Sequence, residues 1–376
     1  MTKCKEYTSD SIEDQTELKN QYGNLLNDKG QLMFKGWARQ PLIKYNPEAL
    51  GRWKKAYRLK EWNYYSVGSD RFYFAVAAID LGYVINFQVF FIDFVDNKTV
   101  QDEVTSSSLT KGLLLPRDSC QQGIHLDYKS KSYSQHFEVN ERCPANNESK
   151  GVLEVYEETL VHTVKVTSQK LKLVAELTFN LSPKRESVVL CTPIGKSNFY
   201  YNRKTNLIPV TGSLMIDGKE YLGQYQLQDA FGILDWGRGI WDYNSFWIWS
   251  TCWGHTNDGR PIGLNLGTGF GDLTTHTENA INMDGIIHKL GHIEFEYNKK
   301  DLMAPWRFIC RHGRFGSTSS LSFTPFRKKW ENNNFGLVMS SFHQIIGKLT
   351  GELILDSGEK VDINIHSFTE VHFARW

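Results

Sequence analysis

The chain has 376 residues, of which 40% are hydrophobic and 23% are charged, so it has the composition of a folded globular protein and enough length for two domains. Its 43 Lys and Arg residues nearly balance its 42 Asp and Glu residues, which leaves a formal net charge of +1. A chain with so little net charge has no global field to attract nucleic acid or an anionic membrane surface. We therefore expect no nucleic acid among its partners.

The N-terminus, the apolar runs and the cysteines indicate where the protein resides. The first 31 residues are polar and contain neither the apolar region nor the cleavage site of a secretory signal. No run reaches the roughly 20 apolar residues of a membrane-spanning helix, so we do not expect an integral membrane protein. The 6 cysteines lie far apart, without the close pairs of zinc sites or disulfide-rich domains. We expect a cytoplasmic protein with free thiols; the sequence indicates no oligomeric state.

The first part of the chain contains the few predicted helices. Residues 1–30 form a polar leader that we expect to be partly disordered or helical, with the best helical pattern at residues 11–26. A short helical turn is expected at residues 47–59. Both lie outside the apolar segments, so they are expected at the periphery of the fold.

The rest of the chain has the pattern of an antiparallel β protein. Segments rich in Val, Ile, Phe, Tyr and Trp alternate with turn dipeptides, and residues 214–222 and 353–365 have the pattern of β-hairpins. Most tryptophans and glycines lie after residue 200, where the composition shifts. These patterns predict an all-β fold with two domains, residues 31–205 and residues 206–376, the second of which contains the candidate site.

A stripe of tryptophans is the densest feature of the second domain. Side chains alternate between the two faces of a strand, so Trp247, Trp249 and Trp253 share one face. One interpretation is a packed β core. The other is the wall of a cavity for a large apolar or planar ligand, because a buried indole N–H needs a partner and filled cores favour aliphatic side chains. The sequence leaves both interpretations open.

Charged residues stand just before this stripe, among three aromatic residues, Trp236, Trp241 and Tyr243. Charges in apolar surroundings are costly unless they are paired, so we expect Arg238 to pair with Asp235 or Asp242. If one aspartate instead lacks a cation, its pKa would rise and it could serve as a general acid, with Tyr243 as a second proton donor. Structural pairing and acid–base chemistry both remain open.

A glycine-rich segment, residues 263–272, follows. It lacks the G-x-G-x-x-G spacing of a dinucleotide fingerprint, and its alternating glycines predict a strand with one bare face that another element or a ligand can approach closely. Farther along, Asp272, Glu278 and Asn279 form a polar group that could line a pocket, bind a metal or solvate a loop. Asn265, inside the glycine-rich segment, could orient polar atoms of a ligand.

Three histidines are weaker candidates. His288 and His292 have the spacing of a helical zinc site, but the adjacent Glu is absent and Gly291 lies in a region with the pattern of strand and turn. We therefore predict no metal site and no cofactor. His343 follows an alternating strand, where it either is a satisfied structural histidine or faces a cavity.

Several motifs in a fixed order resemble a widespread family known as domain of unknown function 2804, from about residue 30 to Trp376. They are Gly36–Leu42, Arg52–Lys54, Trp62–Tyr65, Ile79–Tyr83, Asp235–Gly239, Asn265–Asp272, Thr277–Ala280 and His288–Leu290. Two departures are visible: Asp242 stands where the family pattern Gly-x-Trp-Pro-Tyr has Pro, and residues 343–347 replace a more aromatic variant. The first departure makes Asp235 the better candidate for a catalytic acid.

That family is similar, more remotely, to tandem lipocalin-like proteins, which include the carotenoid 1,2-hydratases and the hydroxyneurosporene synthase group. The resemblance implies two packed lipocalin-like antiparallel barrels with few peripheral helices and an apolar ligand cavity. It implies no particular activity, because the close family has no assigned reaction and the remote relatives combine hydration, cyclisation and lipid carriage. No catalytic residue is carried over from them.

The leading hypothesis is a binding protein or carrier for a hydrophobic small molecule, lipid or isoprenoid-like, in a tryptophan-lined cavity. Besides the tryptophans, the predicted ligand contacts are Arg238, Asn265, Glu278, Asn279 and His343. The first alternative is an acid-catalysed hydratase, isomerase or cyclase in which Asp235 or Asp272 protonates an apolar substrate. The second alternative is a non-catalytic interaction module, which would present an exposed hydrophobic patch.

Overall fold

The computed structural model describes residues 15–107, 113–142, 159–223, 230–334 and 338–375, and nearly all of their regular structure is β-strand. The chain forms two compact units. Unit 1 comprises Met1–Leu59, Ser187–Lys204 and Gly237–Trp376, and unit 2 comprises Lys60–Glu186 and Thr205–Trp236. Strands β13 (Asn198–Ile216) and β15 (Phe231–Ile240) each pass from one unit into the other. The division into consecutive domains at residues 31–205 and 206–376 stays a prediction.

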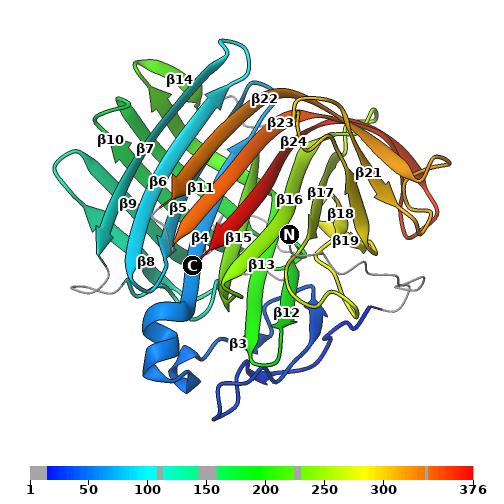
Figure 1. The fold of residues 1–376 in the computed structure, drawn as a ribbon. Helices are drawn as coiled ribbons and strands as arrows, with labels where there is room; N and C mark the ends of the chain where they lie inside the picture. The colour runs from blue at the N-terminus through cyan, green and yellow to red at the C-terminus, as the bar shows by residue number, and fades with distance from the viewer. Residues whose placement is uncertain (1–14, 108–112, 143–158, 224–229, 335–337, 376) are drawn as a thin grey trace, which may run out of the picture. The chain divides into compact units, whose positions relative to one another are not determined.

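The main sheet of unit 1 is a curled antiparallel sheet (Figure 1). Within the described residues its strands lie in the order β19-β18-β17-β16-β24-β23-β22-β21-β20. Their bounds are Asn244–His255 for β16, Pro261–Thr268 for β17, Ala280–Met283 for β18, Ile286–Lys289 for β19, Ile293–Glu296 for β20, Trp306–Cys310 for β21, Ser320–Asn334 for β22, Met339–Ile354 for β23 and Lys360–Arg375 for β24.

The N-terminal part of unit 1 is built from short pairings. Strand β12 (Val188–Ile194) pairs with β2 (Gly36–Ala38) on one side and with β13 on the other. Strands β1 (Gly23–Asn24) and β3 (Ile43–Lys44) form a parallel pair. Two helical turns follow β3, a 3-10 turn at Pro47–Ala49 and a π-helical turn at Lys54–Arg58. The short helical turn predicted at residues 47–59 is therefore confirmed.

The sheet of unit 2 runs in the order β7-β6-β5-β4-β15-β13-β11-β10-β9-β8 among the described residues, and the short β14 pairs with β13. Its remaining strands are Leu59–Gly68 (β4), Phe72–Asp80 (β5), Val84–Asp93 (β6), Lys98–Ser107 (β7), Gly123–Lys129 (β8), Tyr133–Arg142 (β9), Thr159–Ser168 (β10), Leu173–Leu181 (β11) and Lys219–Leu222 (β14). The prediction of an all-β fold with two antiparallel β units and few helices is confirmed.

The turns follow from local sequence. Asp217 and Gly218 join β13 to β14 with positive φ values of 52° and 80°, and Asp284 and Gly285 join β18 to β19 with values of 50° and 91°. Positive φ at both central residues defines the type I′ turn, whose twist matches that of the flanking strands. The two hairpins predicted at residues 214–222 and 353–365 are both present.

The predicted helix at residues 11–26 is wrong where it can be seen; residues 11–14 lie outside the described residues. Glu17 forms a β-bridge with Trp37, and residues 23–24 belong to β1. Leu18 is 3% exposed and its N–H donates to the Trp37 carbonyl. Tertiary pairing of a buried leucine thus overrides the helical propensity of the segment.

The interior of unit 1 is filled with apolar side chains. One face of β16 contributes Ile248 and Cys252 to a cluster that also contains Trp306, Phe323 and Leu349, all buried. Phe323 contacts Trp306 edge-on at 5.9 Å between ring centroids. The tryptophans of the predicted stripe point to the opposite face of β16, because alternate side chains of a strand point in opposite directions. The described cysteines, Cys120, Cys191, Cys252 and Cys310, are free.

Among the described residues, no helix has the length and apolar character needed to cross a bilayer.

The packed interior of unit 1 makes a direct prediction about stability. Replacing Phe323 with Ala should lower the free energy of unfolding by about 3–5 kcal/mol, because the ring is fully buried among aromatic neighbours and leaves a cavity. Phe326→Ala is the matched control, since Phe326 lies in the same strand but is 43% exposed, and it should cost less than about 1 kcal/mol. Urea unfolding measures both; equal losses would contradict the assigned core.

Candidate functional site

The tryptophan stripe of β16 makes contacts within unit 1. The Trp249 Nε1–H donates to Asn265 Oδ1 at 2.9 Å, and the Trp247 Nε1–H donates to Glu370 Oε1 at 3.1 Å. Trp253 stacks on His366, with 5.9 Å between ring centroids and 17° between planes. Each indole is thus matched to a side chain of the protein. These contacts favour the packed interpretation of the stripe over the cavity wall.

A buried ion pair lies on the same side of β16 as Trp249. The Lys204 amine is 3.3 Å from Glu278 Oε2, and the two side chains are 4% and 1% exposed. The same amine lies 4.2 Å from the centroid of the Trp249 ring and 5.2 Å from that of Phe270. Asn202 donates to the Glu278 carboxylate at 3.5 Å. Aromatic faces and hydrogen bonds therefore compensate part of the solvation that both ions lose on burial.

The alternating glycines of β17 make room for this pair. A Cβ atom added to Gly267 would lie 1.7 Å from Glu278 Oε1, so only glycine fits opposite the carboxylate. The bare face predicted for residues 263–272 is covered here by a side chain of the protein itself. This is the close-packing interpretation of the glycine pattern.

Two asparagines tie this region together. Asn265 donates to the Glu278 carbonyl at 2.9 Å, and Asn279 donates to the Gly291 carbonyl at 2.8 Å. The Asn279 Oδ1 also accepts the Gly267 N–H at 2.6 Å. Trp249, Asn265, Glu278 and Asn279, all predicted site residues, thus belong to one buried network of side-chain contacts.

The other predicted residues lie apart from this network. Asp235 and Trp236 belong to unit 2, where they are 8% and 3% exposed in β15. In unit 1, Tyr243 is 42% exposed. Arg238 is fully buried and donates to the Gly237 carbonyl at 2.8 Å, whereas Asp242, one of its two predicted partners, is exposed.

Two further predicted residues of unit 1, Trp241 and His343, pack against aromatic rings. Trp241 is 5% exposed and packs against Tyr200 at 5.1 Å between ring centroids. His343 stacks on Trp330 at 5.8 Å, and burial, with help from Lys328, lowers the pKa of its imidazole.

Asp272 is exposed and accepts hydrogen bonds from the Thr274 N–H and hydroxyl at 3.1 and 2.7 Å. Partial burial raises its pKa, but the Thr274 bonds outweigh this effect, and the pKa of the carboxyl lies below its usual value. Such a carboxylate holds its proton weakly, so it is poorly suited to the role of general acid.

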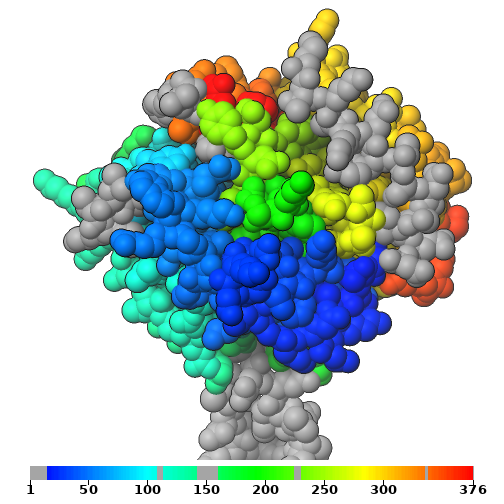
Figure 2. Space-filling view, turned by 60° about the horizontal axis from the view of Figure 1, so that its bottom comes forward, coloured from blue at the N-terminus to red at the C-terminus, as the bar shows by residue number. Residues whose placement is uncertain are grey.

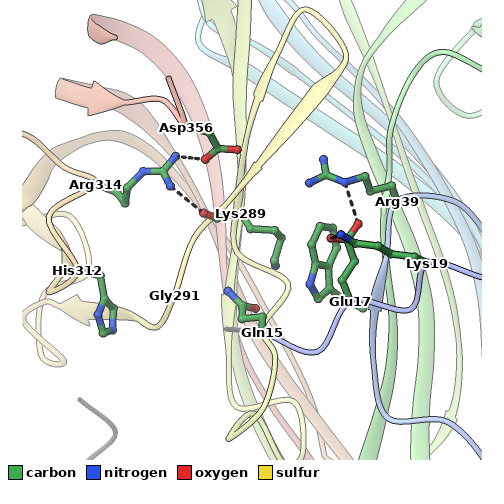
Figure 3. Close-up of a pocket in the computed structure, with 10 residues that line it drawn as sticks. Gln15, Glu17, Lys19, Arg39, Lys289, Gly291, His312, Arg314 and Asp356 are labelled. Atoms are coloured by element: carbon green, nitrogen blue, oxygen red, sulfur yellow. Dashed lines mark hydrogen bonds and ion pairs between the residues drawn. The ribbon is translucent and has the colours of Figure 1, made fainter. Parts of the chain in front are cut away.

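Unit 1 contains a cavity of about 600 Å³ that sequence reasoning did not single out (Figure 3). Its walls come from the N-terminal segment, from β2 and β19, and from the loops that follow β21 and β23. The lining residues are Gln15, Glu17, Lys19, Trp37, Arg39, Lys289, Gly291, His312, Arg314 and Asp356. The cavity is therefore polar and rich in basic side chains, and it contains none of the predicted ligand contacts.

Lys289 is the central cation of this cavity. Its amine donates to the Thr277 carbonyl at 2.6 Å and to the Asn279 carbonyl at 3.0 Å, and it lies 4.8 Å from the centroid of the Trp37 ring. Burial lowers the pKa of the amine to about 7; Arg39 lowers it further, whereas Glu278 and Glu17 raise it. Part of the Lys289 side chain stays exposed although protein atoms enclose the amine.

The other charges of the cavity are arranged in pairs. Arg39 lies 5.0 Å from the Trp37 ring centroid and donates to Glu17 at 3.0 Å. Arg314 donates to Asp356 at 2.7 Å (Figure 3). Within the described residues Lys289 is the lining Lys or Arg that has no carboxylate at ion-pair distance; its amine donates to backbone carbonyls instead.

The N-terminal segment completes the cavity. Gln15 donates to the Leu290 carbonyl at 2.7 Å, and Arg39 donates to the Ile287 carbonyl at 2.8 Å. Figure 2 shows the dark blue N-terminal residues beside the yellow segment near residue 290. The available sequence signals were the segments Gly36–Leu42 and His288–Leu290, which stood out as family motifs without a chemical role.

The described residues contain no group of three or more His, Cys, Asp or Glu side chains that could hold a metal ion. His288 lies in strand β19, so it and His292 do not have the helical spacing of a zinc site. His288 instead lies 3.2 Å from Asp356.

These features define a nearly all-β protein of two antiparallel units, with a buried ion pair and a cationic cavity in one of them. The chain belongs to the family described as a domain of unknown function, DUF2804, whose model matches residues 15–376. The match begins earlier than the predicted start near residue 30, so that residues 15–30 lie inside the family's domain. This agrees with the contribution of Gln15 and Glu17 to the cavity.

Two solved structures are remotely similar to the chain. Kievitone hydratase from Nectria haematococca shares 11% identity over 86% of this chain and 90% of its own, with a TM-score of 0.47. A Nitrosomonas europaea protein provisionally described as AttH shares 9% identity over 84% of this chain and 92% of its own, with a TM-score of 0.41. At these values the likeness says nothing of this chain's ligand or reaction. No curated protein sequence matches the chain.

The buried ion pair predicts a large asymmetry between breaking and replacing it. Glu278→Gln should lower the free energy of unfolding by about 3–5 kcal/mol, because the Lys204 ammonium keeps its burial and loses its counter-ion. The double variant Lys204→Met, Glu278→Gln should recover most of that loss. The control is Glu296→Gln at the exposed pair with Arg307, expected to cost less than about 1 kcal/mol. If Glu278→Gln costs no more stability than Glu296→Gln, the assignment of a buried ion pair is contradicted.

Proposed function

We propose that this protein binds a small organic molecule that carries an anionic group, and that the ligand occupies the cavity of unit 1. The observation that carries the proposal is Lys289, whose side chain lines a cavity of about 600 Å³ and whose amine has no carboxylate at ion-pair distance among the described residues. That volume is in the range of small-molecule sites. The class of function is the one that the sequence predicts, a small-molecule binding protein.

The balance of charge around the cavity supports an anionic ligand. Four Lys and Arg side chains line it, Lys19, Arg39, Lys289 and Arg314, against two carboxylates, Glu17 and Asp356. Three of these cations already have a carboxylate partner, since Arg39 donates to Glu17, Arg314 donates to Asp356, and the Lys19 amine lies 3.7 Å from Glu17. An anion placed beside Lys289 would restore the charge balance without disturbing those pairs.

The position of Trp37 gives the site a fixed geometry. Both Arg39 and Lys289 lie over its ring, and Trp37 is only 3% exposed. The indole therefore holds the two cations in place by cation–π attraction and contributes little surface to a ligand. Preorganised donors of this kind lower the entropy that must be lost when an anion binds.

The ligand proposed here is more polar than the hydrophobic molecule predicted from the tryptophan stripe. A ligand with both an acid group and an apolar chain would satisfy both hypotheses. Calorimetric titration with hexanoate, dodecanoate and the two corresponding alcohols separates the contribution of the acid group to binding from that of the apolar chain. The proposal requires that the acids bind and the alcohols do not; a higher affinity for the longer acid would support an apolar part of the site.

The alternative hypothesis of an enzyme requires a different kind of residue. An acid-catalysed hydratase, isomerase or cyclase requires a carboxylic acid that holds its proton at neutral pH, and Asp272 has the opposite property. Asp235, buried in unit 2, stays the candidate acid of that hypothesis. Turnover would be detected by mass analysis of the bound compound before and after incubation with the protein. If Asp235→Asn still binds the compound but no longer converts it, the enzyme hypothesis is supported.

The pKa of Lys289 gives the binding proposal a pH signature. A carboxylate ligand keeps its charge above about pH 6, whereas the Lys289 amine loses its proton as the pH rises through about 7. The dissociation constant for hexanoate should therefore increase about tenfold between about pH 6 and about pH 8. Buried His276 has a pKa lowered to about 4 by burial, so it stays neutral throughout this range.

Two variants of Lys289 are the controls. Lys289→Arg keeps the charge and should bind hexanoate with little pH dependence, because an arginine stays protonated over the whole range. Lys289→Gln should bind weakly at every pH. A pH profile of Lys289→Arg identical to that of the unmodified protein would assign the titration to another group and contradict the proposal.

A further inference from the structure

Residues 51–58 form an exposed, aromatic and basic projection of unit 1. Leu50 and Leu59, at its two ends, are 5% and 4% exposed and fix it to the unit. Between them all residues from 51 to 57 are exposed. Figure 1 draws the segment as a short coiled ribbon outside the strands. It is a convex turn of chain with buried anchors on both sides.

Two aromatic side chains share one side of this turn. Trp53 is 77% exposed and Tyr57 is 44% exposed, and their rings stack with 5.3 Å between centroids and 21° between planes. Their spacing of four residues places them together on a helical turn. Water surrounds an indole and a phenol that most folded proteins bury at least in part, and this is the signature of a surface used for contact.

The charges of the projection all have one sign. Arg52, Lys54 and Lys55 are exposed, and the segment contains no acidic residue. None of these three cations forms an ion pair within the described part of the chain, which contrasts with the paired cations of the cavity. Arg58 fixes the end of the turn by donating to the Trp241 carbonyl at 2.7 Å. Positive charge is thus concentrated at one place on a protein whose net charge is +1.

We propose that residues 51–58 attach this protein reversibly to a membrane surface that contains anionic lipid. Indole and phenol rings favour the interface between water and lipid, where the ring is buried and the polar edge stays hydrated. Lysine and arginine reach the lipid headgroups with their charge while their methylene chains lie along the apolar boundary. The projection combines both properties on a convex turn that can enter the headgroup layer.

The shape of the projection favours lipid over nucleic acid. Single-stranded nucleic acids bind in positively charged grooves or on open aromatic platforms. Here the two rings stack on each other, and the turn is a protrusion with four basic residues in place of an extended basic groove. Each basic residue near an anionic surface strengthens attachment by about fivefold, so this small patch supports weak and reversible binding that salt weakens.

Sedimentation with vesicles tests the proposal on the full chain. The protein should sediment with vesicles of phosphatidylcholine and phosphatidylserine at low salt, and it should stay in solution with vesicles of phosphatidylcholine alone or at high salt. Trp53→Ala should weaken the binding severalfold, because it removes the exposed indole. The pair Lys54→Glu, Lys55→Glu should abolish it, because it reverses two of the charges.

The matched controls change similar residues elsewhere in unit 1. Trp330→Ala removes another exposed tryptophan, 57% exposed, and Lys299→Glu, Lys300→Glu reverses another exposed pair of lysines. Both should bind vesicles as the unmodified protein does, and circular dichroism verifies that every variant is folded. Three results would overturn the proposal. One is that the protein fails to sediment with the anionic vesicles, and another is that the test and control variants lose vesicle binding equally. The third is tighter binding to single-stranded RNA than to these vesicles.

Discussion

The buried ion pair of Lys204 and Glu278 is the interaction on which the arrangement of unit 1 depends. Two ions that are 4% and 1% exposed are tolerated only if nearby groups compensate their lost hydration. Trp249 does so for the lysine, and Gly267 provides the space that the carboxylate occupies. The aromatic stripe and the alternating glycines, which stand out in the sequence as separate features, thus have a common physical cause.

The segment Thr277–Asn279 connects this pair to the cavity. Its carbonyl groups at residues 277 and 279 accept hydrogen bonds from Lys289, while the side chain of the residue between them pairs with Lys204. The negative charge of Glu278 raises the pKa of Lys289 against the opposing effect of burial. One short segment therefore holds two lysines in different states, the first neutralised by a carboxylate and the second left to titrate near neutral pH beside a cavity.

Sequence patterns determined the fold well and the site only in part. The all-β class and the type I′ hairpins follow from local chemistry, and the face alternation of β16 follows from the period of a strand. The partners of Glu278 could not be found this way, because Lys204 is distant in sequence and no pattern marks a lysine that becomes buried. The cavity was missed for the same reason: Glu17, Arg39, Lys289 and Arg314 come from four separate segments, and single charged residues have no period.

Native mass spectrometry of the protein isolated from its own cells tests the central claim most directly, together with extraction and identification of any bound compound. The account predicts a small organic acid at one molecule per cavity, with occupancy lost in Lys289→Gln and retained in Lys289→Arg. A neutral lipid as the bound compound, or an acid whose occupancy is the same in Lys289→Gln, would contradict the assignment of the ligand to the cationic cavity.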